Sequence, residues 1–279
     1  NTLRAYKSDY KDFAGFCVKH GFKSMPSEPK IISLYLTHLS QTRKFSTLKR
    51  RLASISVIHR LLGHYIDTKH PMITENLMGI KRVKGTYQKA KKPILINDLK
   101  SIINAIDKDK NEKRRSKNKA LILLGFAGGF RRSELVAILY EDIDFVLEGV
   151  KIFVKRSKTD QSGEGMTKGI PYFSNPEYCP VISLKNWLEK SEIKSGKIFD
   201  MSDKSVALTI KKYTAKAGLD SNKYSGHSLR SGFATSTAEI GADERSIMAM
   251  TGHKTTQMVR RYIQEANLFK NNALNKIKI

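Results

Sequence analysis

The sequence predicts a mainly helical α+β protein with one small antiparallel sheet. Most segments repeat apolar residues every three or four positions, which is typical of amphipathic helices. Three short stretches between residues 142 and 172 instead alternate apolar and polar residues, as strands do. A basic segment without periodicity, residues 85–95, separates a wholly helical first part from a mixed second part.

Residues 1–84 are expected to form a domain of four helices, because their apolar residues keep the helical period throughout. Ser27 followed by Pro29 is typical of a helix start, with the serine as N-cap and the proline just inside. The predicted helices are Thr2–His20, one opening at Ser27, Ser46–Gly63 and about Thr74–Lys84.

Residues 85–95 are interpreted as an interdomain linker, and residues 96–279 as a second domain. Its predicted helices are Leu99–Ile106, Lys117–Ala127, Ser183–Ser191, Ser205–Ala217, His227–Ile240, Glu244–Met250, Thr256–Tyr262 and a tail helix over Asn267–Ile279. Its predicted strands are Asp142–Phe145, Val150–Lys155 and Gly169–Tyr172.

The net charge of +25 on 279 residues predicts a polyanionic partner. Repulsion among so many like charges disfavours a compact state unless a partner neutralises it. Residues 1–93 hold 19 Lys and Arg against 5 acidic residues, so both parts of the chain are basic, unlike an enzyme with a basic tail. Double-stranded DNA is the expected partner. A soluble protein that is merely rich in lysine is the alternative.

Metal, disulfide and membrane chemistry are not expected. Cys17 and Cys179 match no metal-ligand spacing, and they are interpreted as reduced thiols of a cytosolic protein. The longest apolar stretch, Ala120–Phe130, is interrupted by glycine and flanked by basic residues. It predicts a buried helix rather than a membrane span.

Two motifs in the second part supply cations at places suited to phosphate chemistry. GGFRRSEL, residues 128–135, places Arg131 after two glycines at a helix start, where a guanidinium and free N–H groups suit a phosphate. The segment 155–172 places Lys158 in a turn between strands, from which it could protonate a leaving oxygen, with Lys168 as the alternative. Taken alone, each cation also fits an ordinary exposed side chain.

Two later motifs add histidines, an arginine and a tyrosine. HSLRSGFAT places His227 and Arg230 three residues apart on one helix face, so that both can meet the same phosphate. TGHKTTQMVRRY places His253 in a turn and Tyr262 on the helix that follows. Each motif alone is common by chance, and such a tyrosine is more often part of a core. The order Arg, Lys, His-x-x-Arg, His, Tyr is more informative.

In this order the second part resembles the catalytic domain of the tyrosine recombinase, or phage integrase, family, which includes the Cre and Xer recombinases and lambda integrase. The helices of residues 1–84 resemble the family's core-binding domain, so the resemblance covers most of the chain and implies a catalytic domain of the tyrosine recombinase type. The matching positions are Gly129, Arg131, Ser133, Glu134 and Leu135, then Ser157-Lys158-Thr159, then His227, Leu229 and Arg230, and finally Gly252, His253 and Tyr262.

The resemblance implies a site-specific recombinase that cleaves and rejoins DNA through a 3′-phosphotyrosyl intermediate, with no ATP, metal or other cofactor. The expected roles are phosphate binding by Arg131, Arg230 and His253, proton acceptance by His227, proton donation by Lys158, nucleophilic attack by Tyr262, and orientation of a catalytic side chain by Glu134.

The resemblance also implies a homotetramer on two duplex sites, acting in the cytoplasm on the nucleoid. A tail helix over about 265–279, with Leu268, Leu274 and Ile277, would dock on a neighbouring protomer, and packing within its own chain is the alternative. Arg132 is the alternative to Arg131 as the phosphate ligand. The expected DNA-binding residues are Lys49, Arg50, Arg51, Arg43, Lys44 and Arg132.

Two other functions are weighed against recombination. One is a DNA-binding protein that keeps the fold without the chemistry, although every residue that the chemistry needs is present. The other is a type IB topoisomerase or a hairpin telomere resolvase, which uses the same nucleophile. The two-domain length and the apolar tail favour recombination over the second.

Overall fold

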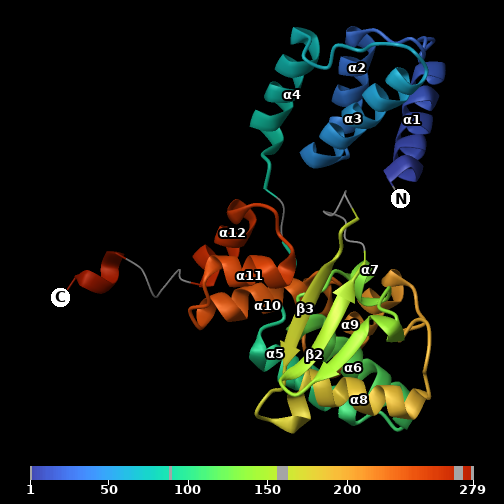
Figure 1. Ribbon diagram of the computed structural model, residues 1–279. Coiled ribbons are helices and arrows are strands. Elements are labelled where there is room, and N and C mark those ends of the chain that lie inside the picture. Colours follow the sequence, from blue (N-terminus) through green and yellow to red (C-terminus); the bar gives the residue numbers. More distant parts are fainter. Residues whose placement is uncertain (1, 88–89, 156–162, 267–272, 278–279) are drawn as a thin grey trace. The chain divides into compact units, whose positions relative to one another are not determined.

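The computed structural model describes residues 2–87, 90–155, 163–266 and 273–277 (Figure 1). The chain divides into two compact units, residues 1–89 (Unit 1) and residues 90–279 (Unit 2). The predicted fold class is confirmed, because helices predominate and three strands form one antiparallel sheet. Among the described residues, no helix combines the length and the apolar character that crossing a membrane requires.

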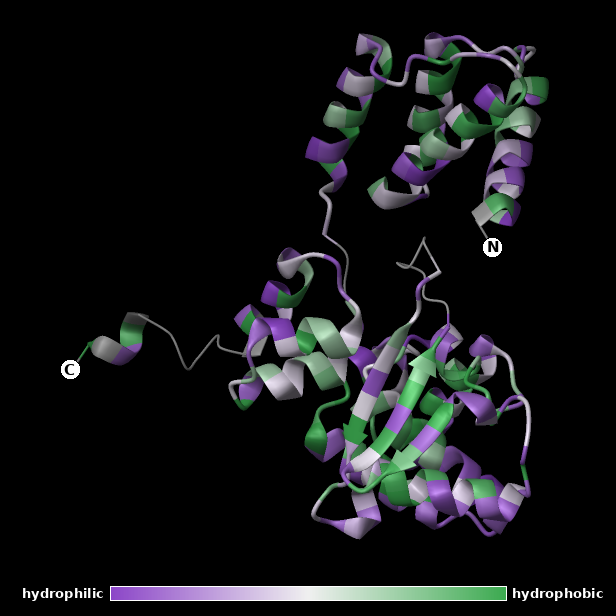
Figure 2. Ribbon diagram, in the orientation of Figure 1, coloured by the Kyte–Doolittle hydropathy of each residue, from purple (hydrophilic) through white to green (hydrophobic). Residues whose placement is uncertain are grey.

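Unit 1 is a bundle of four amphipathic helices. They are α1 (Thr2–Lys19), α2 (Pro29–Ser40), α3 (Phe45–Leu61) and α4 (Pro71–Lys84). In Figure 2, hydrophobic and hydrophilic residues follow one another along each helix, as the periodicity predicts. Helix α1 packs on α3, and α2 packs on α4. The shared core consists of Phe13, Cys17, Ile32, Tyr35, Leu36, Leu39, Leu48, Leu52, Ile55, Ile66, Ile73 and Ile80.

Helix starts in Unit 1 differ slightly from the sequence prediction. The N-cap of α2 is Glu28 rather than Ser27, and α3 begins one residue before Ser46. The backbone N–H of Ser27 instead donates to Nε2 of the buried His59 on α3, 3.2 Å away. The other ring nitrogen of His59 lies 2.9 Å from a carbonyl oxygen of its own helix, to which it donates. Ser27 therefore joins the α1–α2 connection to α3 instead of capping a helix.

Unit 2 contains the sheet and the remaining helices. The helices are α5 (Ile96–Asp107), α6 (Glu112–Ala127), α7 (Arg132–Leu135), α8 (Pro180–Ser191), α9 (Asp203–Lys216), α10 (Ser228–Glu239), α11 (Glu244–Thr251) and α12 (Thr256–Ala266). The strands are β1 (Ile143–Val146), β2 (Gly149–Val154) and β3 (Met166–Pro171), in the order β1-β2-β3. Short 3-10 helices cover Tyr140–Asp142, Pro176–Tyr178, Ser221–Lys223 and Ala273–Lys276.

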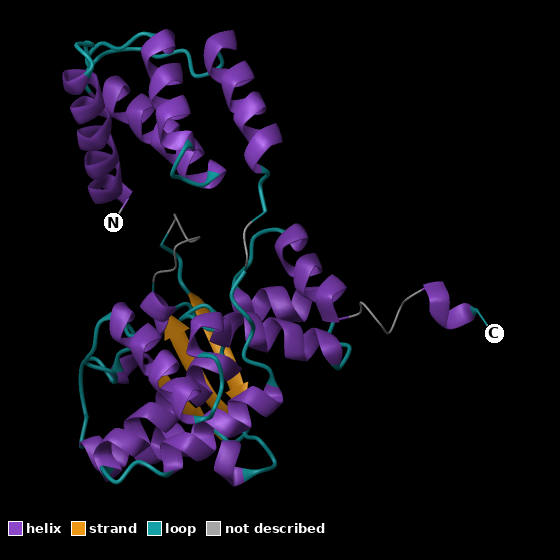
Figure 3. Cartoon of the chain, turned by 180° about the vertical axis from the view of Figure 1, so that it is seen from behind, coloured by secondary structure: helices purple, strands orange, loops and turns teal. Residues whose placement is uncertain are grey.

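The core of Unit 2 forms between one face of the sheet and the helices that cover this face, which lie in front of the strands in Figure 3. Helix α6 is buried on all sides from Ala120 to Ala127, which agrees with its continuous apolar sequence. Val150 pairs with Ile170 and Ile152 pairs with Lys168 across β2 and β3. All four side chains are buried, so a lysine occupies a position of this face where an apolar residue is the rule.

The last part of the predicted linker belongs to Unit 2. The backbone N–H groups of Lys92 and Ile94 donate to the carbonyl oxygens of Lys223 and Ser228, at 2.7 and 2.9 Å. A Cβ atom at Gly232 would lie only 2.0 Å from the carbonyl oxygen of Ile94, so glycine is required where residues 92–94 cross α10. The chain is therefore attached to Unit 2 from Lys92 onward.

The predicted tail helix over 265–279 lies largely outside the described residues, and so does Leu268. The part of the tail that is described, Ala273–Lys276, is a single 3-10 turn. Leu274 and Ile277 are exposed to solvent in this chain. The docking of the tail therefore stays a prediction.

Candidate active site

Arg131 is positioned by Glu134 at the start of α7. Helix α6 ends at Gly128, and Gly129 turns the chain with a φ of +54°, which favours glycine. The backbone N–H of Arg131 donates to Oε2 of Glu134 at 2.9 Å, and its Nη1 lies 2.5 Å from Oε1. Burial alone would raise the pKa of Glu134, but the hydrogen bonds from Arg131 and the charge of Lys168 hold that pKa below its usual value. Glu134 is thus an ionised support for Arg131.

Arg132 faces a different part of Unit 2. Its Nη2 lies 3.7 Å from a carboxylate oxygen of Asp203 on α9. Its stem crosses Gly226, where a Cβ atom would lie 1.8 Å from Cδ of Arg132. Arg131, rather than Arg132, is therefore the arginine that Glu134 orients. Arg132 still contributes positive charge near His227.

Arg230 on α10 is a buried cation with unused donors. The residue is 1% exposed, and its Nη1 donates to the carbonyl oxygen of Gly129 at 2.9 Å. Its Nε and Nη2 have no hydrogen-bond partner among the described residues. Burial and the charge of Arg131 lower the pKa of Arg230 to about 10. Because buried polar groups nearly always have partners, the open donors indicate a binding position for an anion.

Tyr262 and His227 meet at the edge of this cluster. The hydroxyl of Tyr262, on α12, lies 3.4 Å from Nε2 of His227, the N-cap of α10. Partial desolvation of the ring and the charges of Arg230 and Arg131 lower the pKa of His227, although the residue is exposed, and the neutral ring can accept a proton. A cavity of about 290 Å³ borders both residues, and Ser231 also lines it.

His253 lies beside Tyr262 and is buried, with 6% of its surface exposed. The two rings stack with centroids 6.1 Å apart and planes inclined by 28°. Nδ1 of His253 lies 2.8 Å from the hydroxyl of Thr251. Burial, followed by the charges of Arg230 and Arg131, lowers the pKa of His253 to about 4. The ring is therefore neutral at pH 7 in the DNA-free protein.

Lys168, on β3, is buried against the segments that precede Arg131 and His253, and it is not exposed in a turn. It is 1% exposed, and its Nζ donates to the carbonyl oxygens of Gly128, 2.7 Å away, and Met250. Its ammonium also lies 4.5 Å from the centroid of the Phe130 ring. Burial lowers the pKa of Lys168 to about 7. Lys158, the lysine predicted to be the acid, lies outside the described residues.

The structure brings Arg131, Arg230, His227, His253 and Tyr262 together from four separate segments. The charges of Arg131 and Arg230 lower the pKa values of His227 and His253, so the cluster is a region of positive potential, in which Arg230 and His253 are buried and His227 is exposed. The positive charges of such a site repel one another, and a bound dianion relieves this repulsion and is strongly stabilised. A tyrosine hydroxyl next to a neutral histidine gives the same site a nucleophile and a proton acceptor.

The predicted DNA-binding residues of Unit 1 fall into two groups. Arg43, Lys44 and Lys49 are exposed. Arg43 and Lys44, with Lys84 of α4, line a cleft of about 290 Å³. Lys84 was not predicted, since its place next to the start of α3 depends on how α4 packs. These four lysines and arginines present their charges to solvent.

Arg50 and Arg51 instead pair with carboxylates of the bundle, although Arg50 is itself exposed. Both pair with the buried carboxylate of Asp9, and Nη1 of Arg51 lies 3.0 Å from Asp12. The hydroxyl of Ser54 also donates to Asp9 at 2.8 Å. These contacts compete with any phosphate for the two guanidinium groups.

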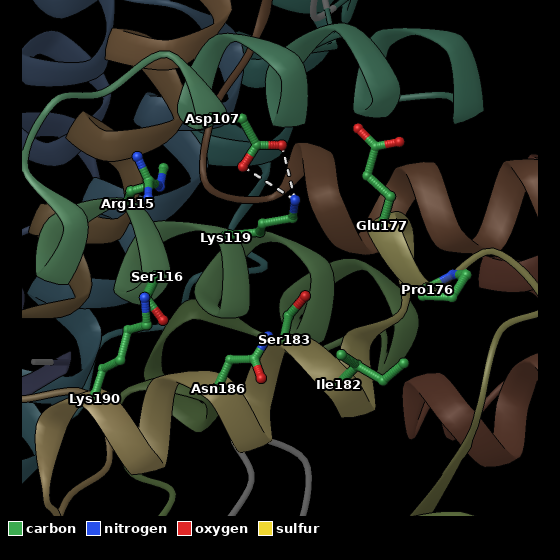
Figure 4. A pocket seen from close by; sticks show the side chains of 10 residues that line it. All are labelled: Asp107, Arg115, Ser116, Lys119, Pro176, Glu177, Ile182, Ser183, Asn186 and Lys190. Atoms are coloured by element: carbon green, nitrogen blue, oxygen red, sulfur yellow. Dashed lines mark hydrogen bonds and ion pairs between the residues drawn. The ribbon is translucent and has the colours of Figure 1, made fainter.

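A second cavity in the described part of Unit 2 lies away from this cluster. This cavity, of about 350 Å³, is lined by residues of α6 and α8, and it is bordered by the ion pair of Lys119 on α6 with Asp107 at the end of α5, at 2.8 Å (Figure 4). None of its lining residues belongs to the cluster around Tyr262. Within the described ranges, no three His, Cys, Asp or Glu side chains are grouped so as to hold a metal ion.

Comparison of the sequence with known proteins identifies relatives along nearly the whole chain. The integrase/recombinase xerD homolog of Selenomonas ruminantium is 44% identical, over 99% of this chain and 85% of that protein. The tyrosine recombinase XerC of Staphylococcus haemolyticus is 24% identical, over 96% of this chain and 87% of that protein.

Solved structures share the fold. The XerH site-specific recombinase, in a post-cleavage complex with a palindromic difH substrate, aligns with a TM-score of 0.66 at 17% identity, covering 89% of this chain and 74% of that chain. A lambda integrase dimer bound to a COC′ core site aligns with a TM-score of 0.60 at 20% identity, covering 100% of this chain and 74% of that one. The sequence pattern of the phage integrase family matches residues 94–268. The chain therefore belongs to the phage integrase family, and it is a tyrosine recombinase.

Proposed function

We propose that this chain recombines DNA at specific sites by forming a covalent 3′-phosphotyrosyl intermediate at Tyr262, without nucleotide or metal. The observation that carries the proposal is the 3.4 Å contact between the Tyr262 hydroxyl and His227 Nε2, beside a buried arginine with open donors. Nucleophile, proton acceptor and anion ligands thus occupy one site.

In the first step the Tyr262 oxygen attacks the scissile phosphorus and the bond to the 5′ oxygen breaks. The phenol, with a pKa near ~10 in water, passes its proton to neutral His227. Arg131 and Arg230 bind the non-bridging oxygens, on which negative charge grows in the transition state. Preorganised donors of this kind typically account for several kcal/mol of the barrier.

In the second step the 5′ hydroxyl of a partner strand attacks the phosphotyrosine and gives its proton to Lys158, which supplied one to the departing 5′ oxygen in the first step, and Tyr262 leaves with a proton returned from His227. One phosphodiester is broken and one is formed, so the bond energy is retained and no nucleotide is consumed. Exchange between strands requires several protomers at once. We infer a homotetramer on two duplexes, working in the cytoplasm on the nucleoid, with the tail docking between protomers.

Covalent trapping tests this function. The wild-type chain is incubated with nicked duplexes from the DNA that flanks its own gene, then denatured and examined for protein-linked DNA. An adduct on the 3′ side of the break supports the proposal. Tight binding of these duplexes without any adduct would favour a non-catalytic DNA-binding protein. Relaxation of a supercoiled plasmid that lacks the site would favour a topoisomerase.

Lys158 remains our proposed acid for the departing 5′ oxygen, and the contacts of Lys168 support a different role. Lys168 binds the carbonyl oxygen of Gly128, which precedes the Arg131 segment, and that of Met250, which precedes the His253 turn. Through these two contacts the Lys168 ammonium holds the segments that carry Arg131 and His253 against β3. It has no open path by which to follow a leaving group.

A bridging sulfur at the scissile 5′ position separates the two lysine roles. A thiolate leaves without a proton, because thiol pKa values lie near ~8.5. We expect Lys158→Ala to slow adduct formation on the oxygen substrate about 10²- to 10³-fold, and to recover most of that loss on the sulfur substrate. Lys168→Met should be slowed on both substrates alike. Rescue of Lys168→Met by sulfur, without rescue of Lys158→Ala, would exchange the two roles.

Unit 1 is proposed to bind the DNA backbone through its exposed cations. Arg43, Lys44 and Lys84 surround one cleft, and Lys49 lies one turn further along α3. Contacts to phosphates position a protein on a duplex without reading its sequence. The cleft is therefore expected to contribute affinity and little specificity.

The salt dependence of DNA affinity distinguishes these exposed cations from Arg50 and Arg51, which pair with carboxylates. Lys49→Gln should weaken DNA binding without abolishing cleavage, and should reduce the slope of log affinity against log salt by about 1. Arg51→Gln is the matched comparison. Because Arg51 pairs with two carboxylates inside the bundle, its replacement should lower the free energy of unfolding and leave the slope nearly unchanged. Equal slopes for Lys49→Gln and the wild type would contradict this assignment.

A further inference from the structure

Thr251, at the end of α11, connects the last turn of that helix to His253. Its side chain is fully buried, and its hydroxyl lies 2.6 Å from the carbonyl oxygen of Ile247 and 2.8 Å from Nδ1 of His253. Gly252 between them adopts a φ of +63°, which turns His253 back over the helix end. Thr251 is the first residue of the motif TGHKTTQMVRRY, in which no role was assigned to it.

The hydrogens in this arrangement can be counted. A hydroxyl has one hydrogen, and a carbonyl oxygen can only accept. The Thr251 hydrogen is therefore donated to Ile247, and the contact with His253 is favourable only if Nδ1 carries a hydrogen and donates to the threonine oxygen. In the neutral ring the other nitrogen, Nε2, then has a lone pair and no hydrogen.

We propose that Thr251 is a positioning residue that holds the Nδ1–H of His253, so that Nε2 is the nitrogen presented to the scissile phosphate and can donate to it only when the ring is a cation. This inference rests on the proposed role of His253 as a phosphate ligand. It adds that His253 takes up a proton together with the DNA. The threonine thereby makes phosphate binding at this histidine depend on protonation.

The surroundings of His253 agree with proton uptake on binding. The charged and titratable groups around the ring come from α7, α10, α12 and β3, and they are Arg131, Arg230, His227, Tyr262 and Lys168. Burial and the charges of Arg230, Arg131 and Lys168 keep the free ring neutral, with a pKa lowered to about 4. A bound phosphate offsets the cations, and an opposite charge at short range raises a histidine pKa.

Nitrogen NMR of the DNA-free protein tests the tautomer without any knowledge of the DNA site. Two-bond proton–nitrogen spectra of the uniformly labelled full chain resolve the seven histidines, and His253→Gln identifies the signal of interest. We expect a neutral ring with hydrogen on Nδ1 at pH 7, unchanged in Thr251→Ser. Thr251→Val should lose this preference, since valine offers no acceptor. A wild-type ring with hydrogen on Nε2, or an unchanged ring in Thr251→Val, would overturn the proposal.

Cleavage supplies the second readout, on the duplex that gives an adduct with the wild-type chain. Only the cation donates from Nε2, so wild-type adduct formation should fall as pH rises through the pKa of His253 in the complex. Adduct formation by Thr251→Val should be slower by on the order of tenfold, a loss like that seen when a metal-bound histidine loses the hydrogen-bond partner of its other ring nitrogen. Its rate should also depend less on pH. Thr251→Ser should restore both rate and pH profile.

The two measurements separate failure of this inference from failure of the proposed function. If the wild-type chain forms no adduct on any DNA, the function fails, while the spectra still judge Thr251. If the wild-type chain forms an adduct and Thr251→Val matches its rate and pH profile, the inference fails alone. A mere loss of folding in Thr251→Val would lower the rate without changing the shape of the pH profile.

Discussion

Tyr262→Phe is expected to bind target DNA as tightly as the wild-type chain and to form no covalent adduct. The substitution removes one oxygen from a half-buried ring, and the packing of that ring against His253 is retained. Without the oxygen no phosphotyrosine can form, and loss of a nucleophile typically lowers the rate by several orders of magnitude. Gel shift measures binding, and denaturing electrophoresis of the nicked substrate measures adduct.

Tyr65→Phe is the control for this experiment, because Tyr65 is 86% exposed in Unit 1 and far from the cluster in sequence. It should form adduct at the wild-type rate. An adduct that persists in Tyr262→Phe would assign the nucleophile to another residue. A parallel loss of adduct in Tyr65→Phe would point to a general effect on folding or binding.

Arg230→Met is expected to reduce adduct formation by about 10²- to 10³-fold, the usual cost of removing one preorganised donor from a site of developing negative charge. Methionine is unbranched and can fill much of the space that the arginine stem occupies. Arg132→Met is the matched control. Arg132 contacts Asp203 on the surface of α9, so its loss should change the rate of adduct formation only slightly.

Arg230→Met should not unfold more easily than the wild-type chain. Arg230 is a buried cation with two unpaired nitrogens, and its lowered pKa, about 10, records the cost of holding that charge out of water. Replacing it with an apolar side chain removes this cost and loses one hydrogen bond, worth about 1 kcal/mol. Thermal unfolding should therefore occur at or above the wild-type temperature. A clearly lower temperature would mean that Arg230 is needed for folding rather than for function.

The ordered motifs, through their resemblance to a known family, predicted that the candidate catalytic side chains share one site, and the structure places all of them together except Lys158, which lies outside the described residues. Arg131, Arg230, His253 and Tyr262 each lie at a helix start, on a helix face or after a glycine turn, and such local signals can be read from sequence. The fold class followed from periodicity alone, because most helices of both units are amphipathic. The bounds of β1 and β2 were within one residue of the prediction, whereas β3 begins at Met166, three residues before the predicted start at Gly169.

Residues whose roles depend on long-range packing could not be predicted in the same way. Lys168 precedes the predicted third strand by one residue, and only the pairing with Ile152 shows that it points into the core. Thr251 looks like an ordinary helix-end threonine until the turn at Gly252 brings His253 against it. Ser27 has the right residue type for a cap, but the backbone bond to His59 places it outside α2.

The attachment of residues 92–94 to α10 limits how this protein can be rebuilt from parts. The carbonyl oxygen of Ile94 lies against Gly232, two residues after Arg230, which would bind the phosphate. A chimaera that takes its DNA-binding unit from another recombinase should therefore be joined upstream of Lys92. A junction further along would replace residues 92–94, which pack against α10, and would therefore change the placement of His227 and Arg230.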